Sequence, residues 1–234
     1  MPGNKLADGY YETDFLVVGG GDAGCSAAIK AAELGVDVLM LEKAKTDRSG
    51  HSGMGMDHVM DFPRDGVSYL DYVKYFFGRH ELLAGPGLVM NPNVGYVLGE
   101  RAWWALGELE KWGMPMRWDD GDYHWVRNGW FGVKTMIGVH WLDIKPALAK
   151  KARQSGVKIL ERTMLVDLLT DNGRIAGATA VNTRTGEFIV IKAKTVLLCT
   201  GNLARNYSPE TPQFYRYKFR YHGSPGAISG DGYA

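Results

Sequence analysis

Residues 14–42 read DFLVVGGGDAGCSAAIKAAELGVDVLMLE, and this stretch decides the fold. Residues 15–18 form a short apolar run, which is typical of a strand buried on both faces of a parallel sheet. An alanine-rich helix is expected to begin near Asp22, and Gly35 is placed to end it. Residues 36–41 then predict a second strand. This order of strand, helix and strand predicts a βαβ unit.

Three glycines, Gly19, Gly21 and Gly24, form a G-x-G-x-x-G turn between the first strand and the helix. The first allows a tight turn, the second lets a pyrophosphate approach the backbone, and the third lets the helix pack closely on the strand. Glu42, about 20 residues further on, completes the dinucleotide-binding pattern. The alternative is an ordinary βαβ turn without a ligand, because glycine-rich turns are common.

Composition limits the classes of partner. The chain has 234 residues and a net charge of +1, so it allows one large domain or two small ones and gives no electrostatic support for nucleic-acid binding. Cys25 and Cys199 lie outside any C-x-x-C motif, so metal sites and disulfides have no signature and both are expected in the core. Since there is neither a transmembrane-length apolar run nor a signal peptide, we expect a cytoplasmic protein that is not integral to a membrane.

The chain beyond the βαβ unit predicts a long excursion. Residues 1–13 are expected to be a loose lead-in. The glycine-rich segment 43–58 follows the second strand, so we expect it over the carboxyl edge of the sheet, where open α/β folds bind ligands; the alternative is a solvated surface loop. Helices are predicted at 68–79, 91–112 and 142–155, with a hairpin or lid at 116–130 whose tryptophans more plausibly pack the loop than cover a cofactor.

A meander is predicted near the end of the chain. A short strand over 157–160 precedes three antiparallel strands, and the Asn172-Gly173 pair predicts a tight hairpin turn between the first two. A further short strand is expected to end at Thr200-Gly201. The predicted strands are 163–169, 174–181, 187–191 and 195–199.

This order of elements resembles the FAD-binding domain of two-dinucleotide-binding flavoproteins. The resemblance implies an α/β fold, namely an FAD/NAD(P)-binding Rossmann-like three-layer (ββα) domain with a parallel sheet and an antiparallel β-meander crossover. LEK at 41–43 and RSG at 48–50 resemble the flavoprotein subunits of succinate dehydrogenase and fumarate reductase. RIAGA at 174–178 and TGNLARNYSP at 200–209 are most similar to adenylylsulfate reductase alpha subunits, and SGDGYA at 229–234 resembles the family's Gly-Asp-Gly element.

The resemblance, which covers residues 12–234, implies how the chain holds FAD. The glycine turn and the first amides of the helix would hold the pyrophosphate. Glu42 would accept hydrogen bonds from the adenosine ribose, and Lys43 would lie near the adenosine. The loop at 49–53 would pass over the pyrophosphate toward the isoalloxazine.

Later segments would complete the site. The backbone at Leu165 would contact adenine, the turn at 200–201 would pass close to the cofactor, and Asp231 would lie near the ribityl chain. The implied cofactor contacts are Gly19, Gly21, Asp22, Ala23, Gly24, Glu42, Lys43, Ser49, Gly50, His51, Ser52, Gly53, Leu165, Thr200, Gly201 and Asp231.

Two departures from the family pattern matter. Covalent members carry a histidine directly after Arg-Ser, whereas here Gly50 holds that place and His51 follows, so we predict noncovalent FAD. In the family, Gly-Asp-Gly opens a helix, and a capping domain and a final segment follow. We therefore expect residues 1–234 to be the N-terminal part of an FAD-binding domain, with the capping domain and C-terminal segment absent.

The leading functional hypothesis is an FAD-dependent oxidoreductase of the fumarate reductase and succinate dehydrogenase type. It would transfer hydride between the flavin and a small anionic substrate and pass electrons to an iron–sulfur partner. The alternatives are a truncated FAD-binding module without turnover, and the same fold using NAD. No residue is assigned to catalysis and none to a metal. His51 and His58 are expected near the flavin, although a structural role in the loop is the more plausible interpretation of each.

Overall fold

The computed structural model describes residues 6–55, 58–59, 68, 70, 92–127, 134–139 and 143–201. The chain divides into two compact units. The first combines residues 1–55 with 145–234, and the second comprises residues 56–144.

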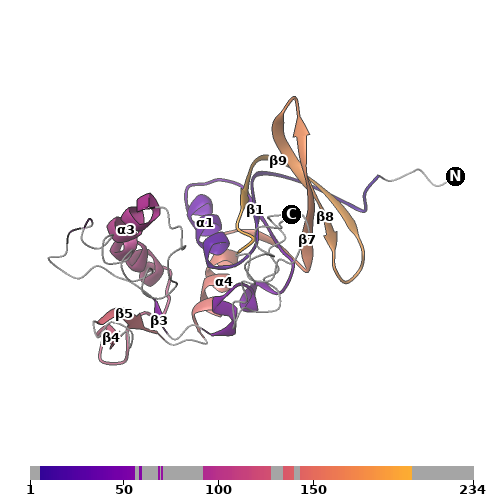
Figure 1. Ribbon diagram of the computed structural model, residues 1–234. Coiled ribbons are helices and arrows are strands. Elements are labelled where there is room, and N and C mark those ends of the chain that lie inside the picture. The colour runs from indigo at the N-terminus through magenta and orange to yellow at the C-terminus, as the bar shows by residue number, and fades with distance from the viewer. Residues whose placement is uncertain are drawn as a thin grey trace, which may run out of the picture. The chain divides into compact units, whose positions relative to one another are not determined.

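A six-stranded sheet with the order β6-β2-β1-β9-β8-β7 forms the centre of the first unit. Four of its strands, β1, β7, β8 and β9, are labelled in Figure 1. Neighbours among β6, β2, β1 and β9 are parallel, whereas β9, β8 and β7 form an antiparallel meander. This arrangement confirms the α/β class with a mainly parallel sheet and an antiparallel crossover. The strands are β1 (Gly9–Val18), β2 (Val38–Glu42), β6 (Lys158–Glu161), β7 (Thr163–Asp171), β8 (Arg174–Asn182) and β9 (Phe188–Leu198).

Alternate residues of β1 face two different layers, because successive side chains of a strand point to opposite faces of the sheet. Leu16 and Val18 belong to an apolar cluster that includes Ala178 of β8 and also packs against Leu168 of β7. Val17 points the other way, and its side chain lies against the N-terminal turn of α1 (Asp22–Glu33). Helix α4 (Ile144–Gln154) contacts α1 through an ion pair in which Lys151 Nζ lies 3.5 Å from a carboxylate oxygen of Glu33.

Strand β1 is longer than predicted. It begins at Gly9 and pairs in parallel with β9, from Gly9 opposite Ile189 to Val18 opposite Leu198. The expectation of a loose lead-in is therefore wrong for residues 9–13. Their backbone groups pair with a strand that lies far away in the sequence. The Thr13 hydroxyl also donates a hydrogen bond of 2.9 Å to the carbonyl oxygen of Asp37.

Strand β9 is continuous, whereas the sequence predicted separate strands at 187–191 and 195–199. Lys192 and Lys194 lie in the gap between the two predicted strands. In the structure both lysines lie on an exposed face and pair with acids of the neighbouring strand: Lys192 with Glu12 at 2.9 Å, and Lys194 with Asp14 at 2.5 Å. The single strand keeps these charges in water while it buries alternate apolar residues.

The predicted turns of the first unit are confirmed. Helix α1 starts at Asp22, and Gly35 follows its C-cap with φ +81°. Asn172 and Gly173 join β7 to β8 with φ values of +49° and +75°, which is the geometry that a two-residue hairpin turn requires.

The second unit contains a helix and a small sheet. Helix α3 (Pro92–Lys111) confirms the prediction at 91–112 and is followed by Gly113 with φ +82°. Strands β3 (His58–Val59), β5 (Lys134–Gly138) and β4 (His124–Arg127) pair antiparallel in that order. Strand β4 comes from the predicted hairpin or lid, and β5 was not predicted. The helix predicted at 68–79 lies outside the described residues, apart from positions 68 and 70.

Two of the loop tryptophans pack within this unit, as expected. The indole of Trp118 donates a hydrogen bond of 3.0 Å to the carbonyl oxygen of Gly138 and stacks on His124, with ring centroids 4.5 Å apart. Trp125 meets Trp103 edge to face at 5.9 Å. Trp130 lies outside the described residues. Among the helices described in either unit, none is long and apolar enough to cross a membrane.

Candidate dinucleotide site at the glycine turn

The carboxyl ends of β1, β2 and β9 meet at the glycine turn. The Gly19 amide donates to the carbonyl oxygen of Leu41 at 2.8 Å, and the Cys199 amide donates to that of Val18 at 2.7 Å. These bonds continue the sheet pairing one residue past the strand ends. The turn therefore lies at the carboxyl edge of the sheet, where open α/β folds bind their ligands.

Two glycines of the turn are required by close backbone contacts. Gly19 has φ +101°, and a Cβ placed on it would lie 2.3 Å from the carbonyl oxygen of Cys199. A Cβ on Gly24 would lie 1.8 Å from the carbonyl oxygen of Gly19. The first glycine thus lets β1 and β9 end side by side, and the third lets α1 start against the strand, as the motif predicts.

The second glycine, Gly21, leaves open space above the turn. Its φ of −66° and ψ of −171° suit any residue, and among the described residues a Cβ there would approach a single atom within 4 Å, the Cα of Gly50, at 3.7 Å. Its carbonyl oxygen accepts the first helical bond, from the amide of Cys25 at 2.9 Å. Because the described peptides are trans, the Asp22 amide points the opposite way, out of the helix. An open cradle below outward-pointing amides at a helix N-terminus fits a pyrophosphate.

The loop at 49–53 lies against this turn. Gly50 has φ +75°, and a Cβ on it would lie 2.9 Å from the Cα of Gly21. The hydroxyl of Ser52 donates a hydrogen bond of 2.5 Å to the carboxylate of Asp22 at the start of α1. The structure thus brings together the glycine turn and the loop that the sequence predicted to cross it.

Glu42 fixes the turn from the side of β2. Its side chain is 5% exposed. One carboxylate oxygen accepts from the amide of Gly20 at 2.7 Å, and the other accepts from the amide of Ala44 at 2.7 Å. A carboxylate oxygen has two lone pairs, so each oxygen keeps one acceptor position for a further hydroxyl group. Glu42, which was predicted to bind ribose, holds the backbone of two segments, at Gly20 and at Ala44.

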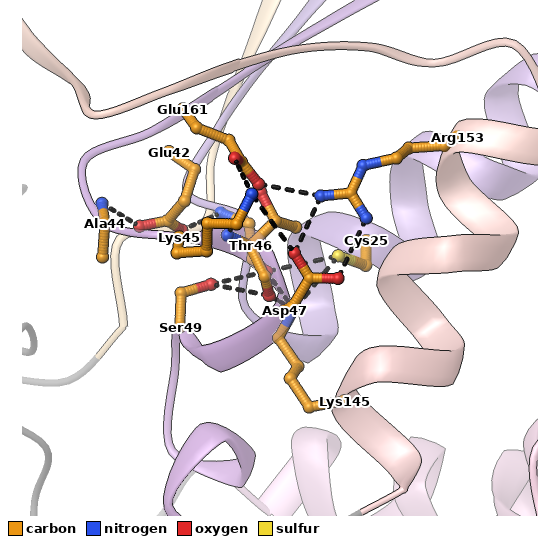
Figure 2. Close-up of polar contacts among 11 residues, drawn as sticks. Cys25, Glu42, Ala44, Lys45, Thr46, Asp47, Ser49, Lys145, Arg153 and Glu161 are labelled. Carbon is orange, nitrogen blue, oxygen red and sulfur yellow. Dashed lines mark hydrogen bonds and ion pairs between the residues drawn. The ribbon is translucent and has the colours of Figure 1, made fainter.

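Sequence reasoning missed Lys145, which lies beneath the turn (Figure 2). Its ammonium group donates to the carbonyl oxygen of Gly20 at 2.7 Å, an oxygen that also accepts from Ser49 at 3.1 Å and from the thiol of Cys25 at 3.2 Å. The helical spacing in the sequence could have shown that Lys145 is buried. Lys145 occupies the first place of an i, i+3, i+4, i+7 series whose other members, Leu148, Ala149 and Ala152, are buried.

An ion-pair network ties the loop after β2 to α4 and β6 (Figure 2). Arg153 binds both carboxylate oxygens of Asp47, at 3.0 and 2.9 Å, and also Glu161 at 2.8 Å. Lys45 binds the other oxygen of Glu161 at 2.7 Å. The hydrogen bonds from Arg153 lower the pKa of Asp47. Burial raises the pKa of Glu161, but the hydrogen bonds from Lys45 and Thr46 outweigh it, so the net shift is downward.

Both cysteines are free thiols. Cys25 is fully buried, as expected, and Cys199 is half-buried. Burial raises the pKa of Cys25, although the ammonium of Lys145 acts in the opposite direction. Burial likewise raises the pKa of the Cys199 thiol.

The other predicted contacts are distributed over several elements. Lys43 is half-buried just past β2, and His51 is exposed in the loop. The amide nitrogen of Thr200 would lie 3.4 Å from a Cβ on Gly19, so the turn at 200–201 reaches the first glycine. Leu165 pairs with Ala180 on β8 and packs against the apolar core. Asp231 lies outside the described residues, and His58 belongs to the second unit.

Comparison with known sequences decides the family. Residues 14–234 match the family described as FAD binding domain. The chain belongs to this family. Its cofactor is therefore FAD, and the alternative in which the same fold uses NAD is set aside.

The chain is similar to a flavoprotein subunit and to two further reductases. It is 26% identical to the fumarate reductase flavoprotein subunit of Escherichia coli, a match that covers 95% of this chain and 35% of that protein. It is 31% identical to urocanate reductase of Eggerthella lenta, over 85% of this chain and 34% of that protein. The structure of adenylylsulfate reductase from Archaeoglobus fulgidus matches with a TM-score of 0.70 and 30% identity, over 96% of this chain and 35% of that one. The chain thus spans about a third of the length of these relatives.

Proposed function

We propose that the chain is the FAD-binding portion of an oxidoreductase of the fumarate reductase and succinate dehydrogenase type. The observation that carries this proposal is the open cradle at Gly21, with the loop at 49–53 against one side of it. FAD, when bound, supplies hydride exchange with a small anionic substrate and one-electron transfer to an iron–sulfur partner. The similarity to a fumarate reductase flavoprotein subunit and to a urocanate reductase supports this assignment of the reaction class.

The residues of this chain would bind and orient the cofactor. The amides of Asp22 and Ala23 would hold the pyrophosphate, since the first amides of a helix lack intrahelical partners. Glu42 would accept from the ribose with its remaining lone pairs, and Lys43 would lie near the adenosine. The remaining contacts proposed from the resemblance are the loop at 49–53, Leu165, Thr200, Gly201 and Asp231.

We also propose that FAD is held without a covalent bond. Gly50 stands directly after Arg-Ser, where covalent members of the family carry their histidine, and its Cα packs against the glycine turn. His51 is exposed one residue later. Because residue 50 is a glycine, it has no side chain that could form a covalent bond to the flavin.

A second candidate function is an FAD-binding module without turnover. The observation in its favour is that the described contacts around the glycine turn hold its backbone and leave space for a cofactor, which requires no substrate site. The two candidates share the same cofactor site and differ in whether bound flavin exchanges electrons with a substrate.

One purification tests both candidates. The protein is loaded with FAD, freed of excess cofactor and reduced chemically, and the flavin absorbance is then followed after addition of an oxidised substrate: fumarate, urocanate or adenylylsulfate. Reoxidation by one of these anions supports the oxidoreductase, and a flavin that stays reduced with all of them supports the module.

The mass of the denatured protein tests the noncovalent attachment, and it should equal the mass of the chain without flavin. A chain that retains the mass of a flavin would show that the cofactor is covalent.

A further inference from the structure

Lys145 is a buried cation, and among the described residues its hydrogen bonds all go to neutral groups. It is 1% exposed. Its three protons reach the carbonyl oxygens of Gly20 and Thr46, at 2.7 and 2.5 Å, and the sulfur of Cys25 at 3.5 Å. Burying a charge without a counter-ion is costly, even where hydrogen bonds are made. A neutral side chain of similar length would fill the same space at a lower cost, so the charge itself calls for an explanation.

The position of the ammonium group fixes the direction of one peptide plane. The carbonyl of Gly20 points inward, to Lys145, Ser49 and Cys25. The same peptide unit carries the amide of Gly21, and in a trans peptide the N–H and C=O bonds point in opposite directions. The Gly21 amide therefore points outward, on the open side of the turn. The hydrogen bond from Lys145 to the Gly20 carbonyl oxygen keeps the Gly21 amide in this orientation.

The buried charge also acts on the ligand through space. A cation within the protein is screened by salt much less than a surface lysine. It polarises the Gly20–Gly21 peptide so that the outward amide is a stronger donor. Both effects favour a ligand that presents negative charge to the turn.

We infer that Lys145 is a positioning residue for the diphosphate of FAD. It orients the amide of Gly21 toward the diphosphate and supplies the positive charge behind the turn. This inference rests on the proposed placement of the pyrophosphate at Gly21. It goes further, because it assigns the selectivity for a diphosphate to a residue outside the glycine motif.

The experiment compares Lys145→Met with Lys150→Met in the complete chain. Methionine matches the length of the lysine stem but lacks the charge, and Lys150 is an exposed lysine of the same helix. Competition titrations against FAD measure the affinities for ADP, which carries the diphosphate, and for adenosine, which does not. Thermal unfolding of the ligand-free proteins reports on the fold.

Charge interactions of this kind correspond to roughly a ten- to hundredfold change in affinity. We therefore expect Lys145→Met to weaken ADP binding by about that factor, to change adenosine binding by less than about twofold, and to leave the melting temperature equal or higher. Lys150→Met should leave the ADP-to-adenosine ratio unchanged.

Two results would overturn the inference. If Lys145→Met weakens ADP and adenosine equally, or leaves ADP unaffected, Lys145 only supports the fold and the proposed site survives. If the unaltered chain binds neither FAD nor ADP, the proposed function fails together with the inference.

Discussion

Gly24 makes the tightest backbone contact of the glycine turn. A Cβ there would lie 1.8 Å from the carbonyl oxygen of Gly19, so Gly24→Ala must push α1 away from β1. We expect the free energy of unfolding to fall by about 1–3 kcal/mol, as for other overpacked sites, and FAD affinity to fall with it. Urea unfolding measures the change. Gly107→Ala is the control, because Gly107 lies in α3 and no atom in the described part of the chain lies within 4 Å of a Cβ there. This variant should stabilise the fold by about 0.5–1 kcal/mol.

Glu42→Gln tests the acid at the end of β2. The amide group of glutamine has one acceptor oxygen, so it cannot accept from the amides of both Gly20 and Ala44. One buried donor is then left unpaired, which costs about 1–3 kcal/mol. We expect urea unfolding to show a loss of that size and FAD binding to weaken. Glu33→Gln, which removes only a partly exposed ion-pair partner of α1, should change stability by less than about 1 kcal/mol. Equal effects of the two variants would contradict the assigned role of Glu42.

The positions of single site residues could be predicted from the sequence only where a motif has a fixed spacing. The glycines and Glu42 stand at positions fixed by the βαβ motif, and the structure brings them together. Lys145 could not be placed in this way. Its position on the apolar face of α4 is visible in the sequence, but the carbonyls of Gly20 and Thr46 that it contacts come from distant segments.

The network of Asp47, Arg153, Glu161 and Lys45 joins three elements and gives their stability a dependence on pH. Both acids have a lowered pKa in the folded chain. A lowered pKa contributes stability above the pKa of the unfolded chain, and this contribution is lost as the pH falls through the folded value. Arg153→Met should therefore destabilise by about 1 kcal/mol at pH 7, a modest value because the pairs are partly exposed.

Urea unfolding at a series of pH values should show the stabilities of the unaltered chain and of Arg153→Met converging as the pH falls below about 4. The control Arg101→Met removes an exposed arginine of α3 that lies beside Glu100, and it should change stability by less than about 0.5 kcal/mol at every pH. A difference for Arg153→Met that persists at the lowest pH would contradict the ionic origin of the stabilisation.

Elements with strong local signals were predicted well. Helices α1, α3 and α4 and the β7–β8 hairpin follow from apolar periodicity, capping residues and the Asn-Gly turn. The predictions for the start of β1 and the middle of β9 were wrong. These two segments form strands because they pair with each other, and they lie far apart in the sequence. Local propensity does not show that Lys192 and Lys194 face acids on the neighbouring strand.

At the scale of the whole molecule, the order of elements indicated the FAD-binding fold, and the family match confirms it. The division into two compact units was not predicted from the sequence, because no stretch with the composition of a linker separates residues 56–144 from the rest of the chain. Strand β5 was missed for a similar reason, since it is defined by pairing with β3 and β4 and not by a periodic sequence of its own.

Gly21→Ala tests most directly the central claim, that the glycine turn holds the pyrophosphate of FAD. The backbone at Gly21 accepts a side chain, and a Cβ there would meet no atom of the described residues closer than 3.7 Å, so the ligand-free fold should keep its stability within about 0.5 kcal/mol. The added methyl group occupies the space through which a pyrophosphate approaches the backbone. A fluorescence titration with FAD should show at least about a tenfold weaker affinity, equivalent to about 1.4 kcal/mol. Equal FAD affinity of Gly21→Ala and the unaltered chain would contradict the claim.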